Sequence, residues 1–138
     1  MTLAEAFLSQ ARSCETLGSP FMGQLLRLLA QIWPAESTIG KVCTNWPGPD
    51  LGPNGASLPL RIAGGLHALI LLERAPELTA SYPPNHVSDD QLGATVLAAL
   101  NNHESFLLDW VKSPPQTNEV RRSAALIATG HWLAGRYD

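Results

Sequence analysis

The sequence predicts an all-α protein: a single orthogonal or irregular bundle of about five to six helices, with no sheet. Apolar residues recur three or four positions apart along most of the chain, which places them on one face of a helix. Capping residues, prolines and glycines divide these stretches into segments of helical length. β-Branched and aromatic residues alternate over no stretch of strand length, so we expect no strand. A chain of 138 residues is about the size of one core, and we expect residues 1–138 to form one domain.

The first helix is bounded by two local signals. Thr2 and Glu5 have the spacing of a capping box, in which a hydroxyl and a carboxylate satisfy free backbone N–H groups. Gly18 supplies the left-handed residue that commonly ends a helix. These signals predict a helix over 3–17.

A second helix is expected to begin at Ser19-Pro20 and to end before Pro34. Two adjacent apolar stripes run along it, and such a wide apolar face predicts a central position in the core. The stripes consist of Phe21, Leu25, Leu28 and Ile32, and of Met22, Leu26, Leu29 and Trp33. A weaker amphipathic pattern predicts a short third helix over 35–45.

The middle of the chain combines a long loop with the most apolar helix. Glycines and prolines punctuate residues 47–57 and predict a loop there. The next helix is expected over 58–74, and it is apolar on nearly every side, which predicts burial against several neighbours. Gly64 and Gly65 lie in its interior, where each glycine costs about 1 kcal/mol relative to alanine. We therefore expect another element to pack closely against them. One further turn is expected over 76–80.

Two more helices are expected in the last third of the chain. Ser88 and Gln91 have capping-box spacing, and apolar residues at helical intervals follow them. This pattern predicts a helix over 89–112 with a bend at 101–102. After a pair of prolines, a last helix is expected over 118–134.

The charge of the chain argues against two large classes of partner. Its formal net charge is −3 and only 15% of its residues are charged, whereas nucleic-acid binding needs a basic patch to displace counterions from phosphates. The sequence contains no Lys/Arg cluster or basic amphipathic stretch to hold an anionic membrane. The N-terminus lacks the basic region of a signal peptide, and the apolar runs are shorter than the ~20 residues that span a bilayer. We therefore expect a cytoplasmic protein that binds neither nucleic acid nor membrane.

The chain carries few of the motifs that indicate catalysis or metal binding. The histidines are His67, His86, His103 and His131, and the nearest oxygen ligands to consider are Glu73, Glu104 and Glu119. No two histidines have HExxH spacing, so we expect no metal site and interpret His67 as a core imidazole with a satisfied ring nitrogen. Cys14 and Cys43 are far apart and are expected to be small buried apolar groups. The sequence contains neither a GxSxG motif nor a phosphate loop, and no catalytic residue is assigned.

The most suggestive polar segment opens the predicted last helix. It sets amide, hydroxyl, carboxylate and guanidinium groups where backbone N–H groups are also free, and such a cluster can bind an anionic or amide-bearing group. The candidate binding residues are Gln116, Thr117, Asn118, Glu119 and Arg122. A structural explanation stays open beside this one: Thr117 or Asn118 caps the helix, Glu119 complements the helix dipole, and the arginines are solvated.

Four segments, in order along nearly the whole chain, resemble a bacterial family known as a domain of unknown function, DUF family 2332. They are Gln10–Cys14 with Leu17–Pro20, Leu58–Arg61 with Leu66-His67, Pro76–Leu78 with Tyr82-Pro83, and Pro115–Val120 with Arg122. The Gln-Thr-Asn-Glu-Val element within the last segment is the most specific. The resemblance adds His67 to the candidate binding residues and favours a binding role for the segment from Gln116 to Arg122.

Longer members of that family continue into an apolar strand and a glycine-rich turn that resembles the nucleotide-binding loop of class I methyltransferases. The resemblance therefore implies that this chain corresponds to the N-terminal helical half of such a protein. It implies no cofactor in this chain, and S-adenosylmethionine only through a second domain.

Three hypotheses for function follow. The preferred one is a non-catalytic helical module that packs on or caps a ligand-binding α/β partner domain, its C-terminal half. The first alternative is half of a methyltransferase-like enzyme, in which Asn118, Glu119 and Arg122 orient substrate. The second alternative is a self-associating helical protein, such as a homodimer, without catalysis.

Overall fold

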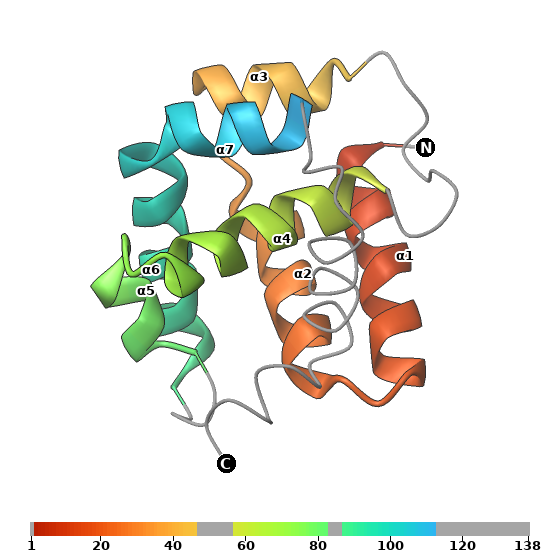
Figure 1. Ribbon diagram of the computed structural model, residues 1–138. Helices are drawn as coiled ribbons and strands as arrows, with labels where there is room; N and C mark the ends of the chain where they lie inside the picture. Colours follow the sequence, from red (N-terminus) through yellow and green to blue (C-terminus); the bar gives the residue numbers. More distant parts are fainter. Residues whose placement is uncertain (1, 47–56, 83–86, 113–138) are drawn as a thin grey trace, which may run out of the picture.

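A computed structural model describes residues 2–46, 57–82 and 87–112. These residues form seven helices and no strand, which confirms the all-α prediction (Figure 1). The helices are α1 (Leu3–Thr16), α2 (Pro20–Ile32), α3 (Thr38–Thr44), α4 (Leu58–Leu71), α5 (Pro76–Ala80), α6 (Asp89–Asn102) and α7 (Glu104–Lys112). Most of the loop predicted over 47–57 and the helix predicted over 118–134 lie outside the described residues.

Helices α1 and α2 form an antiparallel hairpin whose ends are those that the sequence predicts (Figure 1). The Thr2 hydroxyl accepts a hydrogen bond from the Glu5 N–H, and the Glu5 carboxylate accepts one from the Thr2 N–H, so the capping box is confirmed. Gly18 has a φ of 91°, in the left-handed region. The Ser19 N–H then reaches back to the Cys14 carbonyl at 2.9 Å, as in a Schellman motif. A short glycine turn therefore reverses the chain and sets α2 beside α1.

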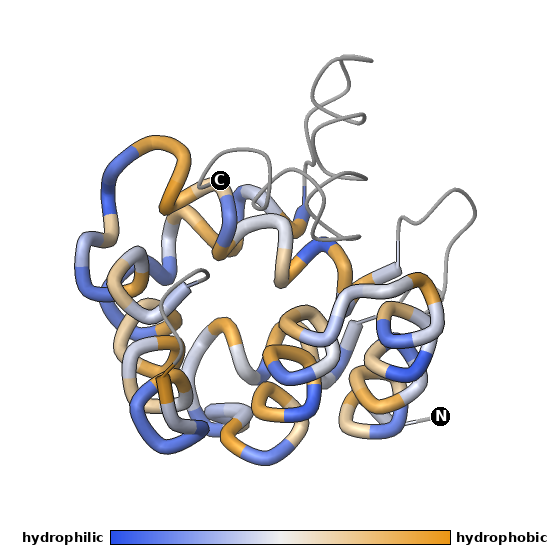
Figure 2. The backbone as a smooth tube through the Cα atoms, turned by 90° about the horizontal axis from the view of Figure 1, so that it is seen from below, coloured by the Kyte–Doolittle hydropathy of each residue, from blue (hydrophilic) through white to orange (hydrophobic). Residues whose placement is uncertain are grey.

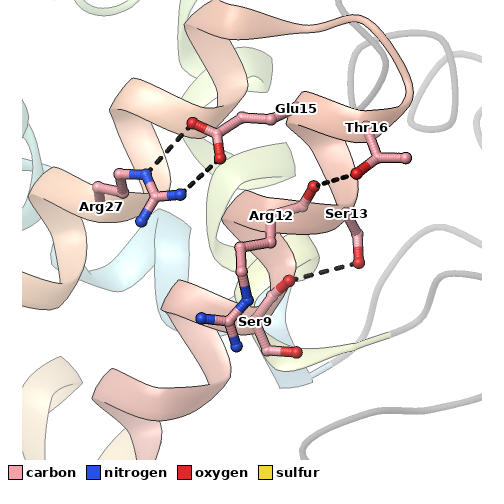
Figure 3. A network of polar contacts seen from close by, with 6 residues as sticks. All are labelled: Ser9, Arg12, Ser13, Glu15, Thr16 and Arg27. Atoms are coloured by element: carbon pink, nitrogen blue, oxygen red, sulfur yellow. Dashed lines mark hydrogen bonds and ion pairs between the residues drawn. The ribbon is translucent and has the colours of Figure 1, made fainter.

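An ion pair holds this hairpin together on its exposed side. Glu15 of α1 and Arg27 of α2 point toward each other, and two guanidinium nitrogens of Arg27 bond the two carboxylate oxygens of Glu15 (Figure 3). The hydrogen bonds from Arg27 lower the pKa of the Glu15 carboxyl below its ordinary value. A Cβ atom at Gly23 would lie 2.4 Å from Glu15 Cγ, so this carboxylate crosses α2 where the helix has no side chain. Glycine at position 23 thus gives Glu15 its path to Arg27.

The core lies between α2, α4 and the helices around them. Orange apolar and blue polar stretches alternate along the described helices in Figure 2, as the helical spacing of the sequence requires. Leu29, Leu66 and Leu100 come from the three helices with the most continuous apolar faces, and all three are fully buried. No helix within the described ranges is both long and apolar enough to cross a membrane.

Helix α4 ends at Leu71, three residues before its predicted end. Glu73 adopts a φ of 57°, and the Arg74 N–H bonds the Leu69 carbonyl at 2.9 Å, which closes a second Schellman motif. The position that usually holds glycine is here a glutamate. The prediction was wrong at this end because the sequence carries no glycine to mark it.

Helices α6 and α7 correct a second prediction, because the single helix expected there is broken rather than bent. His103 has φ −120° and ψ 31°, outside the helical region, and separates the last residue of α6, Asn102, from Glu104. Its N–H still bonds Ala99, while its carbonyl accepts the N–H of Leu107. Asn101, Asn102 and His103 have low helix propensity, and a new helix begins after them in a different direction.

Helix α7 packs directly against the glycine pair of α4, as the sequence led us to expect. A Cβ atom at Gly65 would lie 2.8 Å from Leu107 Cδ2 and 3.3 Å from Trp110 Cδ1, and one at Gly64 would lie 3.3 Å from Trp110 Nε1. The indole of Trp110 therefore lies over bare backbone. Small residues here allow the two helices to approach closely.

Replacing Gly65 by alanine should destabilise the protein by about 1–2 kcal/mol, because overpacking against Leu107 and Trp110 exceeds the gain in helix propensity. Gly93 in α6 is the matched control, since its added Cβ would meet only Ile32 Cγ2 at 3.9 Å. Gly93→Ala should raise stability by about 0.5–1 kcal/mol. Denaturant unfolding of both variants measures the difference, and the same sign for both would contradict this packing.

Replacing Glu73 by glycine should stabilise the protein by about 1 kcal/mol, because glycine adopts a positive φ without steric cost. The same substitution at Glu77, in the first turn of α5, should instead cost about 1 kcal/mol, since a helical glycine is unfavourable. Thermal unfolding compares the two. A loss of stability in Glu73→Gly would show that the left-handed residue is not strained.

Candidate functional site

His67 lies in the interior of α4 and is 1% exposed. Its Nε2 is 3.2 Å from the sulfur of Met22 on α2. A thioether can only accept a hydrogen bond, so Nε2 carries the proton and Nδ1 is left as an acceptor. Burial lowers the pKa of His67 to about 3, which keeps the imidazole neutral near pH ~7.

Tyr82 follows α5 and packs its ring against His67. Their ring centroids are 5.2 Å apart at an interplanar angle of 82°, and the ring of Phe21 of α2 also packs against Tyr82, with centroids 4.8 Å apart. Tyr82 is fully buried, and burial raises the pKa of its phenol, so the hydroxyl stays protonated. Within the described part of the chain, neither Tyr82 Oη nor His67 Nδ1 has a hydrogen-bond partner. We call His67 and Tyr82 the buried polar pair.

The buried polar pair is suited to hydrogen bonding and not to proton transfer with solvent. Both groups are neutral, both are enclosed, and they contact Met22 and Phe21. Among the described residues, no carboxylate forms a hydrogen bond or ion pair with either of them. A general acid or base needs a pKa near the working pH and reach to a substrate, and His67 has neither.

A second polar junction joins α1 to the start of α4. The Ser57 hydroxyl caps α4 by accepting the Leu60 N–H at 3.4 Å and donates to Gln10 Oε1 at 3.1 Å. The Gln10 amide also reaches the Cys14 sulfur at 3.8 Å. Burial raises the pKa of the Cys14 thiol, which disfavours its reactive thiolate.

Arg61, one turn into α4, connects this helix to the C-terminal end of α7. Its Nη1 is 3.4 Å from the Val111 carbonyl, and its guanidinium carbon lies 5.8 Å from the centre of the Trp46 ring. Arg61 Nε is buried, and the described residues offer it no acceptor. No carboxylate in the described ranges pairs with this arginine.

Comparison with known protein families identifies the family of this chain. The sequence profile of a bacterial family, described as "Uncharacterized protein conserved in bacteria (DUF2332)", matches residues 4–138. The chain belongs to the DUF2332 family. No curated protein and no solved structure matches it.

This membership confirms the family that the sequence segments resemble. The family's description assigns no activity, and a methyltransferase-like second half is not part of the finding. Three of the four DUF2332-like segments lie mostly among the described residues. The structure shows two contacts that their residues make. Gln10 meets the residue that caps Leu58–Arg61, and His67 meets Tyr82.

The sequence-predicted site residues are divided between the core and the undescribed part of the chain. His67 is a core imidazole with one bonded ring nitrogen, as its position on an apolar helix indicated. Its role as a binding residue stays a prediction. The other candidates, which are Gln116, Thr117, Asn118, Glu119 and Arg122, lie outside the described residues.

The described histidines and cysteines do not come together. No group of three or more His, Cys, Asp or Glu side chains within the described ranges could hold a metal ion. Cys14 and Cys43 are both free thiols and both buried, which confirms their interpretation as small core groups. Burial raises the pKa of Cys43 to about 12.

Sequence reasoning missed Tyr82 and Ser57 as partners of His67 and Gln10. Ser57 and Gln10 are 47 positions apart, and His67 contacts Tyr82 only because the chain after α4 folds back, so no local spacing indicates either pair. One signal was present: a tyrosine directly before two prolines ends a helical turn, and a buried tyrosine normally needs a hydrogen-bond partner.

The buried imidazole should make the protein sensitive to acid. The unfolded chain takes up a proton at His67 below its ordinary pKa of 6.5, whereas the folded chain does so only near 3, so stability falls as pH falls between these values. Between about pH 7 and about pH 4.5, this one group should remove about 2–3 kcal/mol of unfolding free energy. In His67→Leu that part of the acid dependence should disappear.

The matched control for this measurement is His103→Leu, which removes a partly exposed histidine between α6 and α7. It should keep the full acid dependence, because His67 is unchanged. Carboxylates such as Glu15 contribute equally to every variant and cancel in the comparison. Equal pH profiles for the wild type and His67→Leu would contradict the neutral buried imidazole.

Proposed function

We propose that this chain is a helical module that packs on, or caps, a ligand-binding α/β partner domain. The observation that carries the proposal is a set of aromatic and arginine side chains on and just after α3, α4 and α7, which we call the aromatic–arginine face. Its residues are Trp46, Arg61, Arg74, Phe106 and Trp110, and each is at least partly exposed.

The side chains of this face form two separate stacks. Phe106 and Trp110 have ring centroids 6.0 Å apart with an interplanar angle of 24°. The guanidinium carbon of Arg74 lies 5.2 Å from the centre of the Phe106 ring, and Arg61 lies similarly against Trp46. Stacking holds these long side chains in place, which lowers the entropy lost when a partner binds.

The composition of the face is typical of a protein interface. Tryptophan, phenylalanine and arginine are enriched at interfaces, and Trp and Arg are over-represented among the residues that dominate binding energy. Neither Arg61 nor Arg74 forms an ion pair within the described part of the chain. A partner that presents carboxylates to these arginines would complete the charge pattern and increase the rate of association.

The enzyme-half alternative assigns the chemistry to a second domain. S-Adenosylmethionine would bind in that domain, while Asn118, Glu119 and Arg122 of this chain would orient the substrate. Its support is the sequence resemblance of longer family members to methyltransferases, together with the match of this chain to the family.

The test is binding to the α/β half of a longer family member, supplied as a separate polypeptide. Arg74→Glu and Phe106→Ala should each weaken the affinity about tenfold or more, which is about 1.4 kcal/mol. Arg74→Glu should change stability by less than about 1 kcal/mol, since the cation–π contact that it removes is exposed. Isothermal titration calorimetry and thermal unfolding measure the two effects.

Arg12→Glu is the control, because it reverses the same charge at an exposed position of α1 (Figure 3) and should leave the affinity unchanged. No binding by the wild-type chain would contradict the proposal. Concentration-dependent mass in sedimentation, lost in Phe106→Ala, would favour self-association instead. Methyl transfer that requires both halves and is lost in Arg122→Ala, with binding retained, would favour the enzyme half.

A further inference from the structure

The buried polar pair contains two hydrogen-bonding atoms that no group among the described residues satisfies. His67 is 1% exposed and Tyr82 is 0% exposed, and neither His67 Nδ1 nor Tyr82 Oη has a partner within the described residues. The two atoms have opposite character. His67 Nε2 donates to Met22, which leaves Nδ1 as an acceptor, while the protonated Tyr82 hydroxyl is a donor.

Folded proteins seldom leave such atoms without a partner. More than nine in ten buried polar groups are hydrogen-bonded, to protein or to an ordered water. The exceptions require an explanation. Here the donor and the acceptor are on two rings in contact, which suggests that a single partner serves both. A chain of 138 residues would be expected to enclose about five buried waters, at about one for every 27 residues.

We propose that the core contains an internal hydration site in which one water molecule joins Tyr82 to His67. The water accepts the Tyr82 O–H and donates one of its hydrogens to His67 Nδ1. This arrangement satisfies both orphan atoms without a charge. It links Tyr82, just beyond α5, to His67 in the middle of α4, beside α2.

The surroundings select a neutral ligand of this kind. Met22 and Phe21 supply thioether and aromatic contacts, and no charged group in the described ranges bonds either member of the pair. An anion would meet the electron-rich Nδ1, and a cation would meet no carboxylate to compensate it. Water both accepts and donates, so it fits the donor and the acceptor together. The hydration site does not depend on the proposed partner domain.

A thermal double-mutant cycle on the full chain tests the site. Tyr82→Phe removes the donor and keeps the ring, and it should lower the midpoint of unfolding by about 3–5 °C. In a His67→Leu background the water has already lost its acceptor, so the same change should lower the midpoint by less than about a third of that amount. Ser81→Ala is the control: its buried hydroxyl bonds the Glu77 carbonyl, and its effect should be equal in both backgrounds.

A crystal structure supplies the direct observation. The wild type should show one ordered water within about 3 Å of both Tyr82 Oη and His67 Nδ1, and Tyr82→Phe should lack it. An unchanged or higher midpoint in Tyr82→Phe would overturn the proposal, because removing an unbonded hydroxyl costs nothing. A direct bond from Tyr82 Oη to Nδ1, with no water between them, would overturn it as well.

Discussion

The burial of α4 is the constraint on which the rest of this structure depends. A helix that is apolar on almost every side needs neighbours on every side, and α1, α2, α5 and α7 provide them. Two requirements follow. Its side chains must be small where another helix crosses it, and Gly64 and Gly65 meet this requirement. Its few polar atoms must find hydrogen-bond partners inside the protein. The position of α7 follows from the first requirement, and the contact of His67 with Met22 from the second.

The polar contacts of the core act as junctions between helices. Ser57 joins the start of α4 to Gln10 on α1, and His67 joins its middle to Met22 on α2. Arg61 extends from α4 to the Val111 carbonyl near the end of α7. These residues lie in or beside the segments that carry the family resemblance, so much of that resemblance reflects how α4 is held. The proposed function rests on the aromatic–arginine face, which has the composition of an interface.

Local signals in the sequence predicted most of the fold, whereas the contacts that depend on tertiary packing could not be predicted from it. The capping box at Thr2, the left-handed Gly18 and the proline that starts α2 each act within a few residues, so the sequence displays them. Glu73 takes a conformation that glycine usually occupies, so its residue type gives no signal for it. The pairing of His67 with Tyr82 depends on how the chain after α4 folds back against this helix, which no local signal shows. The polar cluster from Gln116 onward lies outside the described residues, and its two explanations stay open.

The glycine turn between α1 and α2 has a consequence for the order of folding. Glu15 and Arg27 are only 12 residues apart, whereas Arg61 and Val111 are separated by 50. Closing the shorter loop costs less chain entropy, so the hairpin of α1 and α2 can form early as a local nucleus. Among the described helices α7 comes last in the chain, so α4 is covered on that side only when α7 docks. The most apolar segment of the chain is thus the last to be enclosed, and transient aggregation during synthesis would begin there.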